Sequence, residues 1–349
     1  MDLEKTQGTD ILGLSRDDLT AWFAEKNEPA WRADQVMRWL HRRNARSFSE
    51  MTDIAKGLRE TLAESFVIPE PEEAGKAVSE DGTVKYAFSL RDGRRIESVL
   101  IPERGHCTLC VSSQVGCAMG CAFCRTGSLG LTRNLAASEI IGQVRAVRRM
   151  MEKPETLTNL VFMGMGEPLA NYANLVRAVN ILTGNEWGMG FGSRHVTVST
   201  VGLANRIPDL SRDTPANLAV SVNAADDETR QRIMPVNRTY PLAALLAACH
   251  DFFLRPGRRI TFEYVLLKDL NDSERDARNL ARLLSHIPAK INLIAYNPHP
   301  ESPFARPDED RVLAFQKVLT DRNFTAMLRK SKGADILAAC GQLAARMSA

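Results

Sequence analysis

The chain has 349 residues, of which 44% are hydrophobic and 25% charged, with a formal net charge of +3 and seven cysteines. A chain of this length and composition buries a large core, and we expect one large domain with an accessory domain. It has no charged start leading into an apolar run and no stretch of about eighteen apolar residues, so we expect no signal peptide, no membrane contact and a cytoplasmic location. An odd number of cysteines, clustered around one loop, argues against a secreted disulfide framework.

The first seventy residues predict helices. Ser15 and Asp18 resemble a capping box before Leu19, and an apolar stripe with helical spacing follows further along. Residues 32–46 hold five arginines and one histidine against a single aspartate. Contact with nucleic-acid phosphates and a solvated helix face explain this segment equally well.

Asp-Gly pairs at 81–82 and 92–93 separate runs that alternate in character, which predicts a small antiparallel meander. Further along, six apolar runs of strand length alternate with helix-like stretches. The predicted strands are 108–111, 160–163, 195–199, 218–222, 260–266 and 291–294, and the predicted helices are 138–150, 175–182, 242–253, 273–284 and 310–319. Six such units require a parallel sheet with crossover helices. We expect an open, partial barrel, because polar and glycine-rich pieces follow the strand ends, and a doubly wound sheet is the alternative.

Three cysteines, Cys117, Cys121 and Cys124, lie in a C-x3-C-x2-C pattern. Soft thiolates select iron–sulfur clusters, zinc or copper(I). A four-iron cluster normally takes four cysteines, so three would leave one iron open to a small chelating ligand. The alternative pairs Cys107 and Cys110 with Cys121 and Cys124 in a structural zinc knuckle, which leaves Cys117 without a role.

Short polar and glycine residues follow the predicted strands. Gly164-Met-Gly166-Glu167 follows the second strand, where glycines let the backbone approach a ligand closely. Ser199, Ser221 and Asn297 follow later strands. Each alone is most often an ordinary hydrogen-bonding residue, but together they line one rim. Cys249, on a predicted helix, is interpreted as a core residue.

The cysteine spacing, with Phe123 just before the third cysteine, resembles the radical S-adenosylmethionine (radical SAM) superfamily. The run from Cys110 to Cys117 and the ending Ala-Cys340-Gly-Gln-Leu closely resemble the RlmN/Cfr family of RNA adenine methyltransferases, over essentially the whole chain. The resemblance implies an α/β protein with a partial (βα)6 radical SAM barrel. The implied parts are a helical RNA-binding accessory domain at 1–75, a β-meander extension at 76–102, the barrel at 103–335, and a C-terminal segment with the methyl-accepting cysteine at 336–349.

The resemblance also implies a role for each site residue. Cys117, Cys121 and Cys124 would hold a 4Fe–4S cluster. Glu97 would be the acid/base residue, Cys110 the resolving cysteine and Cys340 the cysteine that carries a methyl group. The residues expected to contact SAM are Gly166, Glu167, Ser199, Ser221, Val222, Asn223 and Asn297. Many members read Ser-Leu-His at 221–223, whereas asparagine hydrogen-bonds but cannot titrate.

The implied reaction is methylation of carbon 2 of an adenosine in the peptidyl-transferase region of 23S rRNA, and of the adenosine 3′ to the anticodon in certain tRNAs. It would proceed through an S-methylcysteine, with two SAM per turnover and a flavodoxin- or ferredoxin-type electron donor. Two alternatives stay open. One is methylation of carbon 8 of adenine, as by Cfr, and the other is a non-catalytic zinc-ribbon RNA-binding protein.

Overall fold

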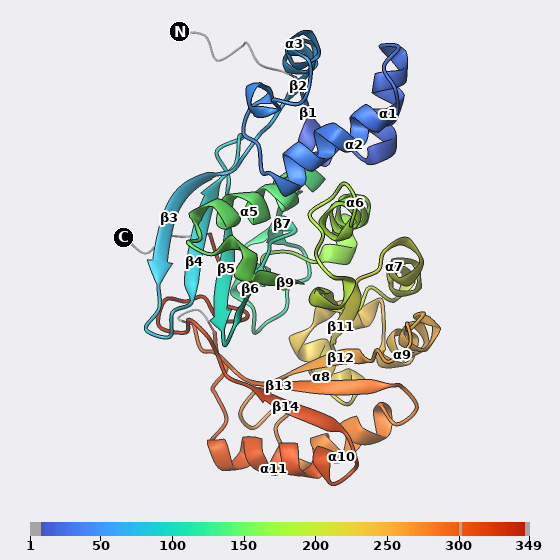
Figure 1. The fold of residues 1–349 in the computed structure, drawn as a ribbon. Helices are drawn as coiled ribbons and strands as arrows, with labels where there is room; N and C mark the ends of the chain where they lie inside the picture. The colour runs from blue at the N-terminus through green and yellow to red at the C-terminus, as the bar shows by residue number, and fades with distance from the viewer. Residues whose placement is uncertain (1–7, 300–301, 346–349) are drawn as a thin grey trace.

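The computed structural model describes residues 8–299 and 302–345, and its centre is a curved ten-stranded sheet (Figure 1). The strands lie in the order β14-β13-β12-β11-β10-β9-β6-β5-β4-β3. Their bounds are β3 Glu72–Val78, β4 Val84–Ser89, β5 Arg95–Glu103, β6 His106–Cys110, β9 Leu157–Phe162, β10 Val196–Thr200, β11 Asn217–Ser221, β12 Ile260–Leu266, β13 Ala289–Ala295 and β14 Thr325–Arg329. Strands β3 to β6 pair antiparallel, and every pair from β6 to β14 is parallel.

The parallel strands follow one another in chain order without a reversal, which distinguishes a partial barrel from a doubly wound sheet. Crossover helices follow one another around the outside of the curved sheet (Figure 1). They are α5 Ala137–Met150, α6 Tyr172–Thr183, α7 Ile207–Asp213, α9 Leu242–Asp251, α10 Glu274–Leu283 and α11 Glu309–Thr320. A further short helix, α8 Asp227–Ile233, precedes α9 in the connection between β11 and β12. The six predicted strands and five predicted helices are present, whereas β14, α7 and α8 were not predicted.

The N-terminal part is helical, with α1 Arg16–Glu25, α2 Trp31–Met37 and α3 Lys56–Ser65, and a π-helical turn at Arg38–Arg42. Ser15 caps α1 as predicted: its hydroxyl accepts from the Asp18 backbone N–H at 3.1 Å, and the Asp18 carboxylate accepts from the Ser15 N–H at 2.9 Å. Strand β1, Thr9–Asp10, pairs with β2, Phe66–Val67, and closes this part of the chain.

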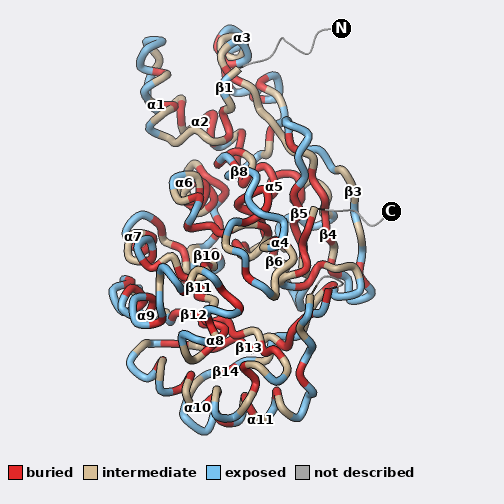
Figure 2. The backbone as a smooth tube through the Cα atoms, turned by 180° about the vertical axis from the view of Figure 1, so that it is seen from behind, coloured by how far each residue is buried: buried red, intermediate tan, exposed pale blue. Residues whose placement is uncertain are grey.

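A buried polar contact joins the N-terminal helices to the barrel. The Arg145 side chain, on α5, is fully buried, donates to the Ala45 carbonyl at 2.7 Å and pairs with Glu70 at 2.9 Å. Asn44 donates in turn to the Arg145 carbonyl at 3.1 Å. Figure 2 shows α5 mostly as buried residues, with exposed residues along α1. The accessory helices are therefore fixed against α5.

Candidate active site

The three-cysteine loop begins on a small hairpin beside the barrel mouth. Strand β7, Gln114–Cys117, pairs antiparallel with β8, Gly130–Asn134, and the short helix α4, Arg125–Ser128, follows Cys124. Gly116 has φ +77°, and a Cβ at that position would lie 1.9 Å from the Gly130 carbonyl oxygen. Only glycine lets the two strands approach this closely.

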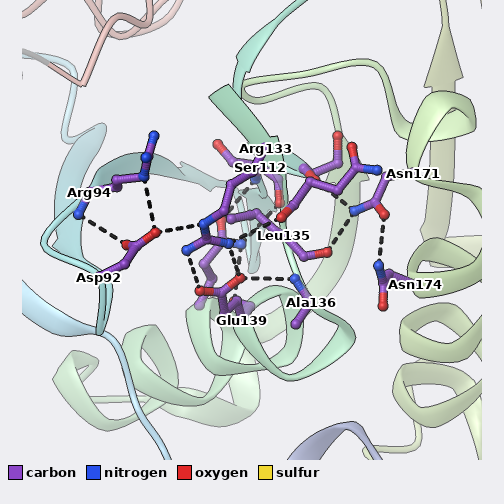
Figure 3. A network of polar contacts seen from close by, with 12 residues as sticks. Asp92, Arg94, Ser112, Arg133, Leu135, Ala136, Glu139, Asn171 and Asn174 are labelled. Atoms are coloured by element: carbon purple, nitrogen blue, oxygen red, sulfur yellow. Dashed lines mark hydrogen bonds and ion pairs between the residues drawn. The ribbon is translucent and has the colours of Figure 1, made fainter. Parts of the chain in front are cut away.

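Polar contacts hold the base of this hairpin (Figure 3). Arg133, on β8, donates to Asp92 in the β4–β5 turn at 2.7 Å and to both oxygens of Glu139 on α5 at 2.7 and 2.8 Å. The Asn171 side-chain amide donates to the carbonyls of Leu135, at 2.7 Å, and Ser113, at 2.9 Å. The loop is thus attached to the sheet, to α5 and to the segment after β9.

The three cysteines form a thiol cluster in a poorly solvated place. All are free, and burial raises the pKa of Cys117 to about 12, with Glu167 and Cys124 adding to the effect. Burial likewise raises the pKa of Cys121, and the other two cysteines raise it further. Such thiols ionise only beside a strong positive charge, which a bound metal centre supplies. The donor set therefore fits a metal cluster.

The structure does not bring together the four cysteines of the zinc-knuckle alternative. Within the described ranges, no group of three or more His, Cys, Asp or Glu is placed to hold a single metal ion. Cys107 lies at the opposite end of β6 from Cys110, with its sulfur 3.6 Å from the Thr156 hydroxyl. The zinc-knuckle alternative therefore receives no support.

A cavity opens at the carboxyl ends of the parallel strands, beside the cysteine loop. We call it the strand-end cavity. Its lining includes Cys121, Cys124, Gly166, Glu167, Ser199, Ser221, Asn223, Asn297 and Cys340. Of the seven residues expected to contact SAM, only Val222 is absent from the lining. Its side chain is fully buried, its N–H donates to the Glu263 carbonyl at 3.1 Å, and its carbonyl accepts from Arg230 at 3.1 Å.

Glu167 presents a buried carboxyl group to this cavity. One oxygen accepts from the Leu169 N–H at 3.0 Å and the other from the Val201 N–H at 2.8 Å. Burial raises the pKa of Glu167 to about 7, although these hydrogen bonds oppose the shift. A ligand ammonium group would favour the charged carboxylate here.

Asn223 fits both the backbone conformation and the hydrogen bonds at its position. It adopts φ +52°, a left-handed conformation that asparagine tolerates better than most residues. Its side-chain oxygen accepts from the Val265 N–H at 2.8 Å, and its carbonyl accepts from the Asn271 amide at 2.7 Å. Asn223 therefore ties the end of β11 to β12 at the cavity wall.

Cys340 and Cys110 face a second, smaller cavity, which we call the two-cysteine cavity. It has a volume of about 60 Å³, and its lining includes Cys110, Met163, Glu263, Asn297, Arg329 and Cys340. The Cys340 carbonyl accepts from the Asn297 amide at 3.4 Å, and the Gly341 carbonyl accepts from the Arg125 N–H at 2.7 Å. Cys340 lines both cavities, so one side chain borders the predicted SAM contacts and Cys110 together.

Glu97 lies behind the cavities and is not among the residues that line either one. It is buried, pairs with Lys85 at 3.4 Å and accepts from the N–H groups of Ala344 and Ala345 at 2.8 and 3.1 Å. Lys85 also donates to the Leu337 carbonyl at 3.2 Å. In this arrangement Glu97 anchors the segment that carries Cys340.

Sequence reasoning missed three charged residues at the site: Arg230, Glu263 and Arg329. Arg230 lies in a charged heptapeptide that is typical of a solvated helix, so no sequence signal reveals its burial. Glu263 is the one charged residue of strand β12, which is otherwise apolar or aromatic except for Thr261, and a charge in such a strand was a usable signal. Arg329 lies on the unpredicted strand β14.

The fold and the site together define a class. A partial barrel with a three-cysteine loop and a polar cavity at its strand ends is the architecture of a radical SAM enzyme, and residues 111–281 match the radical SAM superfamily. Residues 9–68 match the "Ribosomal RNA large subunit methyltransferase N-terminal domain". A solved radical SAM methyltransferase from Sphaerobacter thermophilus is similar, with a TM-score of 0.89 and 43% identity, covering 97% of this chain and 100% of that one.

Curated relatives identify the family. A dual-specificity RNA methyltransferase RlmN from Desulfosudis oleivorans is 50% identical, over 96% of this chain and 91% of its own length. Those of Anaeromyxobacter dehalogenans and Geobacter sulfurreducens are 52% and 51% identical, over 99% and 97% of this chain and 94% and 93% of theirs. The chain belongs to the RlmN family of dual-specificity radical SAM RNA methyltransferases.

Membership of this family means that the enzyme uses a 4Fe–4S cluster and SAM, and that its substrate is RNA. In the described part of the chain, no helix has the length and apolar character needed to span a membrane.

Proposed function

We propose that this enzyme methylates carbon 2 of an adenosine in the peptidyl-transferase region of 23S rRNA and of the adenosine 3′ to the anticodon in certain tRNAs. The observation that supports the route is the place of Cys340, which lines the strand-end cavity and also the two-cysteine cavity that holds Cys110. A methyl carrier needs to reach its donor on one side and the thiol that releases it on the other.

In this proposal Cys117, Cys121 and Cys124 hold the cluster, and the lining of the strand-end cavity, with the Val222 backbone, holds SAM. The cluster and SAM supply the methyl carbon and the one-electron chemistry that unreactive C–H bonds require. Glu167 orients the cofactor, because its buried carboxylate accepts hydrogen bonds at the cavity wall.

Cys340 would accept a methyl group on its sulfur. Loss of one hydrogen atom from that methyl group, to the one-electron chemistry that SAM supplies when bound, would let the carbon form a bond to the adenine ring. The adduct would then lose the ring proton and one electron, which returns to the redox centre. The Cys110 thiolate would attack the Cys340 sulfur, and the bond from sulfur to carbon would break with its electron pair left on the carbon, which takes up a proton, so that a disulfide between the two cysteines remains. A flavodoxin- or ferredoxin-type donor supplies electrons, and reduction of the disulfide restores both thiols. Glu97 accepts the ring proton once its contacts to the C-terminal segment are released.

The N-terminal helices form the RNA-binding part in this proposal. An open cavity of about 680 Å³ between these helices and the sheet is lined by four cationic side chains, those of Arg46, Lys56, Arg59 and Arg91. Such groups bind phosphates without reading sequence, and the target base must leave its RNA context to reach Cys340. We propose the same four parts of the chain as above, at 1–75, 76–102, 103–335 and 336–349. Residues 1–7, 300–301 and 346–349 lie outside the ranges that the structure describes.

Nucleoside mass spectrometry of 23S rRNA and tRNA from a strain that lacks the gene tests this function. We expect 2-methyladenosine to be absent and to return when the parent gene, but not the Cys340→Ala gene, is supplied. Loss and return of 8-methyladenosine instead would show the carbon-8 activity and overturn the proposal.

A further inference from the structure

Arg230, on α8, is a fully buried cation whose hydrogen-bond acceptors are all uncharged. It donates to the carbonyls of Val222 at 3.1 Å, Val201 at 2.7 Å and Tyr240 at 3.2 Å, and to the Asn237 side-chain oxygen at 2.7 Å. No ion pair of Arg230 occurs within residues 8–299 and 302–345. Asp227 makes no hydrogen bond to Arg230, but its charge favours the guanidinium cation, and the Asn237 amide between them donates to Asp227 at 2.9 Å.

Two of these carbonyls belong to the wall of the strand-end cavity. Val201 follows β10 and lines the cavity, and its N–H donates to Glu167 at 2.8 Å. Val222 lies between Ser221 and Asn223, which both line the cavity. The guanidinium group therefore holds the ends of β10 and β11 at a fixed separation.

Helix α8 also contacts the cysteine loop. The Ala122 N–H donates to the Ile233 carbonyl at 2.9 Å, and Cys121 packs in one apolar cluster with Ile233 and Met234. Helix α8, which carries Arg230, consequently joins the cofactor wall to the loop that carries the three cysteines.

A buried guanidinium without an anionic partner is costly, because desolvation disfavours its charge. Burial lowers the pKa of Arg230 to about 10, and Cys121 is the largest of the influences that oppose this effect. A cubane with three thiolates carries net negative charge, which increases when the cluster is reduced. A neighbouring fixed cation favours the reduced form, so a bound cluster would give Arg230 countercharge beyond that of Asp227.

We propose that Arg230 is a positioning residue that clamps the Val201 and Val222 backbone for SAM and, as a buried countercharge, raises the reduction potential of the cluster. The inference rests on the proposed ligand set, which includes Cys121.

The test compares Arg230→Met, which removes the charge, with Arg230→Lys, which keeps the charge but loses the planar fork. The matched control is Arg145→Met, which removes another fully buried arginine at the junction of α5 with the N-terminal helices. The readouts, on anaerobically purified full-length protein, are iron content, the cluster midpoint potential by electron paramagnetic resonance titration, and the dissociation constant for SAM.

We expect Arg230→Met to shift the midpoint potential to a more negative value and to weaken SAM binding by at least about tenfold, as hydrogen bonds to two wall carbonyls are lost. Arg230→Lys should keep the parent potential but still weaken SAM binding, and Arg145→Met should change neither value. An unchanged potential in Arg230→Met with full iron content would overturn the countercharge role. Parent-like SAM binding in Arg230→Lys would overturn the clamp.

If Arg230→Met yields no folded protein, Arg230→Gln provides the uncharged comparison, with the same negative shift expected and an unchanged potential overturning the role. Failure of the proposed ligand set is seen separately, because Cys121→Ala would then retain the cluster.

Discussion

Substitution of Gly166 by alanine tests how the backbone shapes the cofactor wall. Gly166 has φ +100°, and a Cβ there would lie 2.5 Å from the Cβ and 2.8 Å from the backbone nitrogen of Gln114. The strained conformation costs about 1–3 kcal/mol for a residue with a side chain. The overlap involves backbone and cannot be relieved by a rotamer change, so it costs about another 1–3 kcal/mol. We therefore expect Gly166→Ala to lower the free energy of unfolding by about 4 kcal/mol.

SAM binding should also weaken in this variant, because the Gln114 side-chain oxygen accepts from the Glu167 N–H at 2.8 Å and would move with Gln114. Urea denaturation and calorimetric SAM titration of anaerobic protein measure both effects. Gly93→Ala is the control for strain alone, with φ +76° and no atom within 4 Å of the added Cβ, and should cost about 1–2 kcal/mol. Gly57→Ala, in α3 with open space around it, should stabilise by about 0.5 kcal/mol. A Gly166→Ala protein as stable as Gly93→Ala, with parent-like SAM affinity, would refute the reasoning.

His41 is buried and burial lowers its pKa to about 3, so its contribution to stability is complete above pH 6.5 and is lost as the pH falls toward 3. Between pH 7 and 5 the free energy of unfolding of the parent protein should fall by about 2 kcal/mol, which urea denaturation measures. A His41→Leu protein whose stability depends on pH in the same way would contradict this prediction. Cys110→Ala should still methylate Cys340 but remain cross-linked to RNA, which denaturing gels would detect, and normal turnover would disprove the resolving role. The double change Arg46→Ala and Lys56→Ala removes two exposed cations from the N-terminal cavity. It should make the slope of log binding constant against log salt concentration shallower by the amount expected for about two lost phosphate contacts. An unchanged slope in a filter-binding assay would place the RNA elsewhere.

Local sequence patterns predicted most of the fold, because buried strands such as β13 consist mainly of apolar residues and amphipathic helices need a regular apolar stripe. Strand β14 escaped prediction because it lies at the sheet edge and only Ala326 in it is buried. Helix α8 escaped because its heptapeptide has no apolar stripe, and its burial comes from contacts with distant loops.

Part of the candidate site could likewise be predicted from local sequence, and part depends on tertiary contacts. The cysteine spacing and the strand-end residues are local features, so their gathering at one cavity followed from the parallel sheet alone. Tertiary contacts decide the rest. The C-terminal segment brings Cys340 to the same cavity as Cys110, and its Ala344 N–H donates to the Glu97 carboxylate. Sequence spacing cannot reveal either contact, because the residues are far apart in the chain.

The central claim is that the methyl carbon reaches RNA from the sulfur of Cys340. Protein whose Cys340 carries a carbon-13 methyl group, freed of SAM, can be given unlabelled SAM, a reductant and a 23S rRNA fragment for one turnover. The account predicts that mass spectrometry finds carbon-13 in the methylated adenosine and none left on Cys340. Unlabelled methyladenosine, with carbon-13 retained on Cys340, would contradict it.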